Sequence, residues 1–167
     1  MKILSTRGLL LVFSVVLCLL TVSSAQAQIP KFQALYLLNF SNKMEWDQSN
    51  IKIGVIGTSK VTEELNALAT KYTNISVEKM EAEELSKDCQ VIFLPASQTK
   101  NFSLIQSKIG DSSIVLVTED SDLAAKGAEI SFFLAGNKLK FTINKTALDA
   151  SGVKAPDRLL SVANVIN

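Results

Sequence analysis

The sequence predicts an α/β fold with a mostly parallel central sheet, helices on both faces and an antiparallel hairpin near the C-terminal end. Apolar strand patterns alternate with amphipathic helical patterns, as they do in parallel sheets wound with helices. The runs at 89–95 and 112–119 are almost continuously apolar, which indicates strands buried on both faces. A Gly-Asn pair at 136–137 then joins two strands with no helix between them.

The predicted elements follow one another without a linker, a repeat or a low-complexity tract, so residues 28–167 are expected to form one domain. In chain order we expect a helix over 30–46, a strand over 51–57, a helix over 60–72, a strand over 75–80, a short acidic helix or turn over 81–87, a strand over 89–95, a helix over 99–109, a strand over 112–119, the hairpin over 128–144, a short helix over 144–150 and a last helix over 156–166.

Apolar spacing assigns the inward faces of these elements. In the helix over 60–72, Val61 and Leu65 recur at helical spacing and are expected to face the core. The first helix begins with Pro30, which suits a first helical turn. Its expected packed face consists of Phe32, Leu35, Tyr36, Asn39, Phe40 and Lys43. In the hairpin, which is expected to finish the sheet, the predicted core residues are Phe132, Phe141 and Ile143.

The first 27 residues are expected to be a cleaved signal peptide. Basic residues precede an apolar run over 9–22, and small residues ending in Ala25 and Ala27 follow it. This A-x-A pattern predicts cleavage before Gln28 and therefore export. The apolar run is short for a membrane span, which needs about 20 apolar residues. A retained N-terminal anchor is the less favoured alternative.

The charge of the chain argues against a nucleic-acid partner. The full chain has 17 basic and 16 acidic residues, and loss of Lys2 and Arg7 with the signal peptide leaves 15 basic residues and a net charge of −1. Nothing in the sequence forms the basic stripe or arm that binds a phosphate backbone.

The chain is also poor in catalytic residue types. It has no His, which removes the commonest general base and the commonest transition-metal ligand. Cys89 is the one Cys outside the signal peptide, so a thiolate cluster and a Cys-His pair are excluded. We therefore expect no enzyme, no metal and no cofactor. For Cys89 a buried apolar thiol is favoured over an intermolecular disulfide.

Two loops at the carboxyl ends of predicted strands are candidate ligand sites. Thr58 and Ser59 stand at a predicted helix N-terminus, which can bind an anion or simply be capped by a hydroxyl. Glu119, Asp120 and Asp122 follow the strand over 112–119, where ligands of open α/β sheets usually bind. These carboxylates suit a hard cation, but a solvated loop with a helix cap is favoured. A small-ligand-binding protein using both loops is therefore an alternative function.

Trp46 is the only Trp of the chain, and two interpretations of it stay open. It is either a buried aromatic residue at the helix end or an exposed anchor for a protein partner. As candidate partner contacts we name Trp46, Glu119, Asp120 and Asp122.

The order of segments resembles the YfiR family over essentially the whole mature chain. That family has a Tyr-containing helix ending in Glu-Trp, a strand ending in Gly, a Cys-initiated strand, a Gly-Gly-x-Ile-x-Phe strand, a strand closing Phe-x-Ile-Asn, and a Leu-Leu pair near the C-terminus. The matching positions here are Tyr36, Glu45, Trp46, Gly57, Cys89, Ile130, Phe132, Phe141, Ile143, Asn144, Leu159 and Leu160.

The resemblance implies an exported, non-enzymatic regulator with an α/β fold. The best-known members of the family act in the periplasm, where they bind the sensor domain of an inner-membrane diguanylate cyclase. They restrain synthesis of cyclic di-GMP and hence biofilm formation, and an outer-membrane lipoprotein can sequester them. A sensor histidine kinase is the alternative target, and a homodimer stays open.

Two departures from the family pattern limit what the resemblance implies. Better-known members carry a disulfide between a Cys in the first strand and the Cys that opens the strand over 89–95. Here Gly54 occupies the first of these positions, so redox control through that bridge is not expected. The family's Gly-Gly pair is Gly127-Ala128 in this chain.

Overall fold

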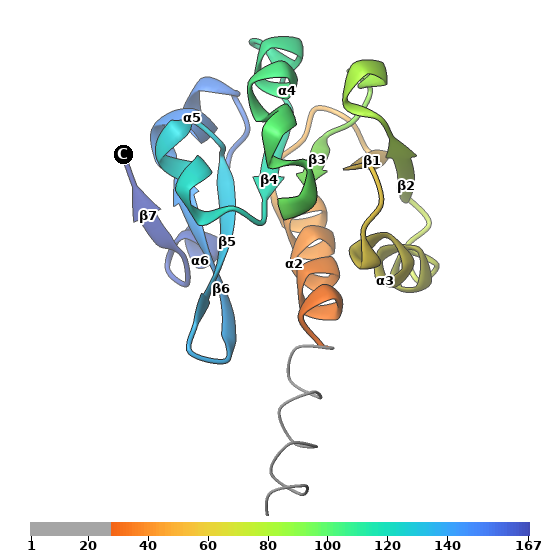
Figure 1. The fold of residues 1–167 in the computed structure, drawn as a ribbon, viewed down its shortest axis with the longest axis horizontal. Helices are drawn as coiled ribbons and strands as arrows, with labels where there is room; N and C mark the ends of the chain where they lie inside the picture. Colours follow the sequence, from red (N-terminus) through yellow and green to blue (C-terminus); the bar gives the residue numbers. More distant parts are fainter. Residues whose placement is uncertain (1–27) are drawn as a thin grey trace, which may run out of the picture.

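The centre of the protein is a seven-stranded sheet with the order β2-β1-β3-β4-β5-β6-β7 (Figure 1). It is seen in a computed structural model that describes residues 28–167, and the predicted signal peptide lies outside these described residues. The strands are β1 Ile51–Ile56, β2 Ile75–Met80, β3 Val91–Leu94, β4 Val115–Thr118, β5 Ile130–Ala135, β6 Lys138–Asn144 and β7 Asn164–Ile166. Strands β1 to β5 pair in parallel and β5 pairs with β6 antiparallel. The predicted fold class is thus confirmed.

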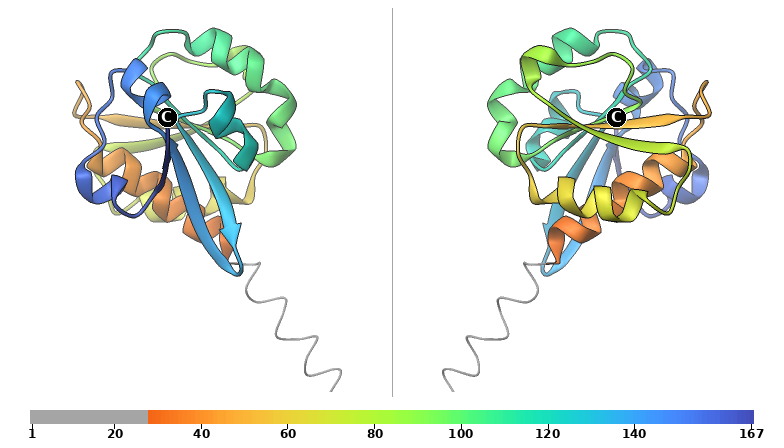
Figure 2. Two further views of the ribbon diagram at one scale, coloured as in Figure 1. Left: turned by 90° about the vertical axis from the view of Figure 1, so that its left-hand side faces the viewer. Right: turned by 90° about the vertical axis from the view of Figure 1, so that its right-hand side faces the viewer.

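Helices cover both faces of this sheet, as predicted. They are α2 Ile29–Lys43, α3 Lys60–Ala69, α4 Phe102–Ile109, α5 Lys145–Ala150 and α6 Asp157–Leu160, with 3₁₀ segments η1 Ala82–Glu84, η2 Ala96–Asn101 and η3 Ser121–Lys126. Figure 2 shows α2 and α3 on one face and α4 on the other. Each face has its own apolar cluster, because alternate residues of the buried strands point in opposite directions.

An aromatic cluster ties α2 to the β5–β6 hairpin. The ring of Phe40 lies 5.1 Å from that of Phe141, and Tyr36 lies 5.2 Å from the same ring. Phe132 stands 6.3 Å from Phe93 and so links the hairpin to the centre of the sheet. Phe132, Phe141 and Ile143 are buried, which confirms them as core residues.

The predicted packed face of the first helix is wrong in part. The structure buries Tyr36 partly and Phe40 fully, but Phe32 and Leu35 are 45% and 38% exposed. Asn39 and Lys43 of the predicted face are also exposed. The helix instead buries Gln33, Ala34, Leu37, Leu38, Phe40 and Ser41. Both faces of this helix carry large apolar residues, so its periodicity did not decide which of them meets the sheet.

The prediction of one last helix over 156–166 is also wrong. The helix α6 stops at Leu160, and Asn164–Ile166 form β7, which pairs with β6 in parallel. The hairpin therefore does not finish the sheet. The outer edge of β6 at 142–144 offers backbone groups to this segment, and pairing there overrides its weak helical pattern.

The turn of the hairpin depends on a single glycine. Gly136 has φ of +61°, whereas no residue other than Gly has a positive φ in the described part of the chain, so Asn137 keeps a negative φ. A two-residue loop with Gly first and a following residue at negative φ is the type II′ pattern, which matches the twist of the strands.

Cys89 is a buried free thiol, as predicted, with only 1% of its surface exposed. Burial raises the pKa of this thiol to about 11, against an opposing effect of Lys52, so the group stays protonated near neutral pH. A Cβ placed on Gly54 would lie 3.1 Å from the Cys89 sulfur. A Cys at position 54, where the family's disulfide partner stands, would therefore lie close enough to bond with Cys89.

Replacing Gly54 with Cys is expected to form a disulfide with Cys89 under oxidising conditions. The two positions lie within reach of a disulfide, and the nearest obstacle is the flexible end of Met80, 2.9 Å from the added Cβ. Closing this loop is expected to stabilise the protein by about 2 kcal/mol relative to the reduced variant. Thiol titration and urea unfolding, with and without reductant, check both outcomes. Two free thiols after oxidation would contradict the geometry.

Candidate functional site

The predicted partner-contact residues lie at two opposite ends of the sheet. Trp46 precedes β1 and is partly buried at the amino end of the parallel strands, where its Nε1 donates a hydrogen bond of 2.8 Å to the Ser41 carbonyl. Glu119 follows β4 at the carboxyl end. The fold therefore does not bring Trp46 and the 119–122 carboxylates into one site.

The carboxyl end of the sheet is closed by internal hydrogen bonds. Glu119 accepts from Gln33 Nε2 at 2.8 Å and from the Ala96 backbone N–H at 2.7 Å, which ties α2 and η2 to the end of β4. Asp120 caps η3 by accepting from the Asp122 N–H at 3.0 Å. Asp122 is exposed, whereas Glu119 and Asp120 are partly buried.

The other candidate loop is also occupied by internal contacts. The Ser59 hydroxyl accepts a hydrogen bond from the Val61 N–H and caps α3. Beside this loop, Gln98 packs so closely on Gly57 that a Cβ there would lie 2.6 Å from the Gln98 amide nitrogen. Both candidate loops at the carboxyl end of the sheet are thus engaged in contacts within the protein.

A largely apolar surface lies instead between α2 and α6, which run side by side on the same face of the sheet in both views of Figure 2. A groove of about 560 Å³ separates them. Its lining residues are Tyr36, Asn39, Lys43, Pro156, Arg158, Leu159 and Val162. We call this feature the α2–α6 groove.

Exposed apolar side chains extend the α2–α6 groove over the neighbouring surface. Val162 is 65% exposed, and Val165 in the edge strand β7 is 42% exposed. On α2, Phe32 and Leu35 add the apolar face that was expected to pack inward. A run of large exposed apolar residues around a groove is typical of a protein-binding surface.

Basic groups border the α2–α6 groove. Lys43 and Arg158 are exposed, and the ion pairs found within residues 28–167 join other residues, Lys52 with Glu78 and Lys145 with Asp149. The groove therefore combines an apolar floor with positive charge at its rim. This combination suits an apolar segment that carries carboxylates.

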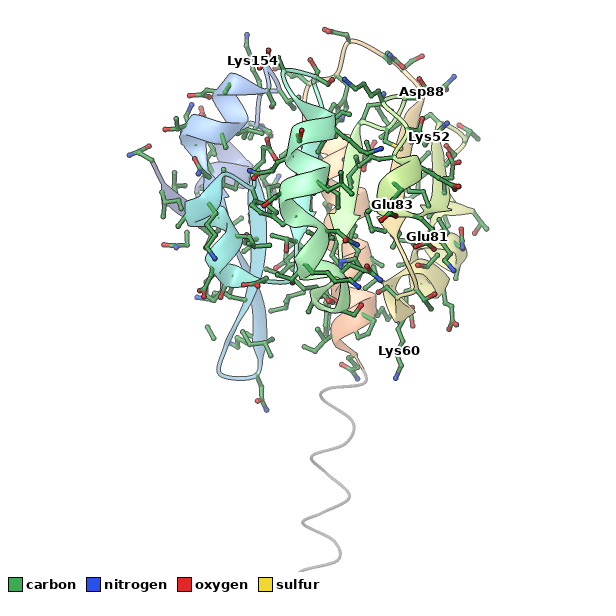
Figure 3. The ribbon with its side chains drawn as sticks, turned by 45° about the horizontal axis from the view of Figure 1, so that its top comes forward. Lys52, Lys60, Glu81, Glu83, Asp88 and Lys154 are labelled. Carbon is green, nitrogen blue, oxygen red and sulfur yellow. The ribbon has the colours of Figure 1, made fainter. Side chains whose placement is uncertain are left out.

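The opposite edge of the sheet has a different character. Strand β2 exposes Glu78 and Lys79, and Figure 3 shows Lys52, Glu83 and Asp88 on the same side of the molecule. Charges of both signs on an edge strand discourage other strands from pairing with it. The apolar surface of the described residues is thus concentrated on the α2–α6 side.

Sequence reasoning missed the α2–α6 groove for two identifiable reasons. The apolar spacing predicts the wrong packed face for the first helix, and the pattern over 156–166 predicts one continuous helix. A usable signal was present, because Ala34, Leu37 and Leu38 form a second apolar face on the first helix. Only one face of a helix can pack on one sheet, so a helix with two apolar faces leaves the other exposed unless a second element covers it.

The described residues contain no helix long and apolar enough to cross a membrane. Within the same range, no three acidic or Cys side chains gather in a way that could hold a metal ion.

Two solved structures share the fold. The "ABC domain in complex with L-Trp" from Streptococcus pneumoniae matches with a TM-score of 0.58 and 17% identity, over 70% of this chain and 55% of that one. A conserved domain protein from Vibrio cholerae matches with a TM-score of 0.62 and 12% identity, over 83% of this chain and 60% of that one. The chain thus spans less than two thirds of either protein, and these identities show the fold alone.

Family membership comes from the sequence. No curated protein matches the chain. The family model described as YfiR/HmsC-like matches residues 30–164, from the first turn of α2 to the first residue of β7, and thus covers strands β1 to β6, the aromatic cluster and the α2–α6 groove. The chain belongs to the YfiR/HmsC-like family.

Proposed function

We propose that this protein is an exported regulator without catalytic activity, which binds the periplasmic sensor domain of an inner-membrane diguanylate cyclase and restrains it. The observation that carries the proposal is the YfiR/HmsC-like match over residues 30–164, since the family consists of regulators rather than enzymes. The absence of His from the chain supports it. Control of cyclic di-GMP, and through it of biofilm formation, would follow from this restraint.

The α2–α6 groove is the proposed docking surface for that sensor domain. Its proposed occupant is an apolar segment flanked by carboxylates, because Lys43 and Arg158 border a floor that is apolar except for Asn39. Apolar side chains in such a groove supply most of the affinity, whereas the rim charges favour the correct partner and speed encounter.

Affinity capture tests the proposed partner. The chain from Gln28 onward, immobilised and exposed to mild detergent extracts of its own cell membranes, is expected to retain a diguanylate cyclase. Recovery of a sensor histidine kinase instead would replace the cyclase but keep the regulatory mode. Recovery of an outer-membrane lipoprotein alone would identify a sequestering partner and leave the cyclase unsupported. Failure to retain any membrane signalling protein would overturn the proposal.

Replacing Val162 with Glu is expected to weaken binding of the captured partner by roughly tenfold or more. The new carboxylate would be desolvated against the apolar floor of the α2–α6 groove and would repel the carboxylates of the proposed segment. Because Val162 is 65% exposed, the free energy of unfolding is expected to change by less than about 0.5 kcal/mol. Titration calorimetry of the purified pair measures the loss.

Leu104→Glu is the matched control for this variant. Leu104 is also an exposed apolar residue, but it lies on α4, on the other face of the sheet. Its replacement should leave partner binding unchanged. Equal effects of the two variants would move the docking surface away from the groove. Loss of a dimer in Val162→Glu, seen by light scattering, would instead assign the groove to a second copy of the chain.

A further inference from the structure

A second cavity lies between the C-terminal end of α4 and helix α5, away from the α2–α6 groove. Its volume is about 170 Å³. Ile109, Ala147 and Ala150 supply apolar walls, and two carboxylates, those of Glu129 and Asp111, line it as well. Gln106 and Ser151 add further polar groups, but no Lys or Arg is among the lining residues.

Glu129 reaches this cavity because β4 and β5 separate there. The two strands pair only at Val117 with Ile130 and at Thr118 with Ser131. One residue earlier, the backbone N–H of Leu116 donates instead to Glu129 Oε2 at 2.9 Å. The carboxylate thus takes the place of a backbone acceptor at the point where the two strands diverge, and one of its edges faces the cavity.

The Glu129 carboxylate is nine-tenths buried and has no positive neighbour among residues 28–167. The residue is only 9% exposed. Burial raises the pKa of this carboxyl to about 7, opposed by hydrogen bonds from the Leu116 N–H and from its own N–H, and no charged group contributes to the shift. Such a carboxyl is neutralised by a proton at low pH, and when it is ionised a cation in the cavity would stabilise it.

We propose that the cavity binds a small organic ammonium ion, with the ammonium group on the Glu129 carboxylate and the hydrocarbon part against Ile109, Ala147 and Ala150. The cavity opens to solvent on one side, and its volume of about 170 Å³ admits a small occupant of about six non-hydrogen atoms. The three apolar residues favour an alkyl ammonium ion over a hydrated metal ion, which needs more oxygen ligands than Glu129 and Asp111 supply. This inference does not depend on the proposed partner.

Titration with n-butylammonium chloride tests the site in the chain from Gln28 onward. Saturable shifts of the Leu116 amide and the Ile109 methyl signals are expected at pH 8 in two-dimensional NMR spectra. Neither n-butanol, which lacks the charge, nor sodium chloride at the same ionic strength should produce them. Equal shifts with butanol, or shifts that never saturate, would overturn the proposal.

A variant and a pH change test the role of the carboxylate. Glu129→Gln keeps an acceptor for the Leu116 N–H but removes the charge, so butylammonium should no longer bind, whereas the exposed Glu84→Gln should bind as the wild type does. For the wild type, the apparent Kd should rise about 30-fold from pH 8 to pH 5.5, because only the ionised fraction of Glu129 binds. Unchanged binding in Glu129→Gln, or at pH 5.5, would contradict the assignment.

Discussion

Replacing Glu129 with Gln is expected to raise the free energy of unfolding at pH 8 by about 3 kcal/mol. Burial raises the pKa of this carboxyl from 4.5 to about 7, and each pKa unit corresponds to about 1.4 kcal/mol. The folded protein holds the proton more tightly than the unfolded chain between these two values. Wild-type stability is therefore highest below pH 4.5, as far as this group is concerned, and falls as the pH rises to about 7.

Urea unfolding at several pH values checks this prediction. The advantage of Glu129→Gln over the wild type should grow from pH 5 to pH 8 and then level off. Glu84→Gln removes the same charge from an exposed position and should change stability by less than about 0.5 kcal/mol at every pH. Parallel stability curves for the wild type and Glu129→Gln would show that the carboxylate is not desolvated in the folded protein.

Replacing Phe132 with Ala is expected to destabilise the protein by about 3–5 kcal/mol. The side chain is buried and packs against the rings of Phe40 and Phe93, so its loss removes apolar contacts and leaves a cavity. It also joins the β5–β6 hairpin to the centre of the sheet. Because β7 pairs with β6, the edge of the α2–α6 groove should loosen with the hairpin.

Phe133→Ala is the matched control in the same strand. Phe133 points to the opposite face, is partly exposed and belongs to neither apolar cluster, so its loss should cost about 1 kcal/mol or less. Urea unfolding compares the two variants directly. A similar loss for both would mean that the aromatic cluster does not hold the hairpin in place.

Much of the fold could be predicted from local patterns. The apolar runs at 89–95 and 112–119 became the central strands β3 and β4, because such runs are stable only when both faces are covered. Gly136 predicted the hairpin because the turn needs a positive φ that glycine adopts without strain. Ser59 caps α3, and its hydroxyl lies where a hydroxyl at a helix start is expected.

The candidate surfaces were much harder to predict, because in each case the local sequence is compatible with two different structures. The first helix has two apolar faces, and contact with the sheet selects the one that contains Leu37 and Leu38. The segment Asn164–Ile166 becomes a strand because β6 offers it a free edge. In the sequence, Glu129 is an ordinary charged residue next to a predicted strand. Its carboxylate is buried because β4 and β5 separate there and it accepts a hydrogen bond from the Leu116 N–H.

The sequence by itself determined the class of fold, the family, and the lack of His and of a second Cys in residues 28–167. These properties are local or compositional: strand and helix periods, an ordered set of short motifs, and the absence of His. The tertiary structure alone decided which apolar side chains remain exposed around the α2–α6 groove and which carboxylate is buried beside a cavity. The exposed apolar surface and the buried carboxylate both depend on contacts between residues far apart in the chain. A local sequence pattern does not show which of these residues will shield one another from water.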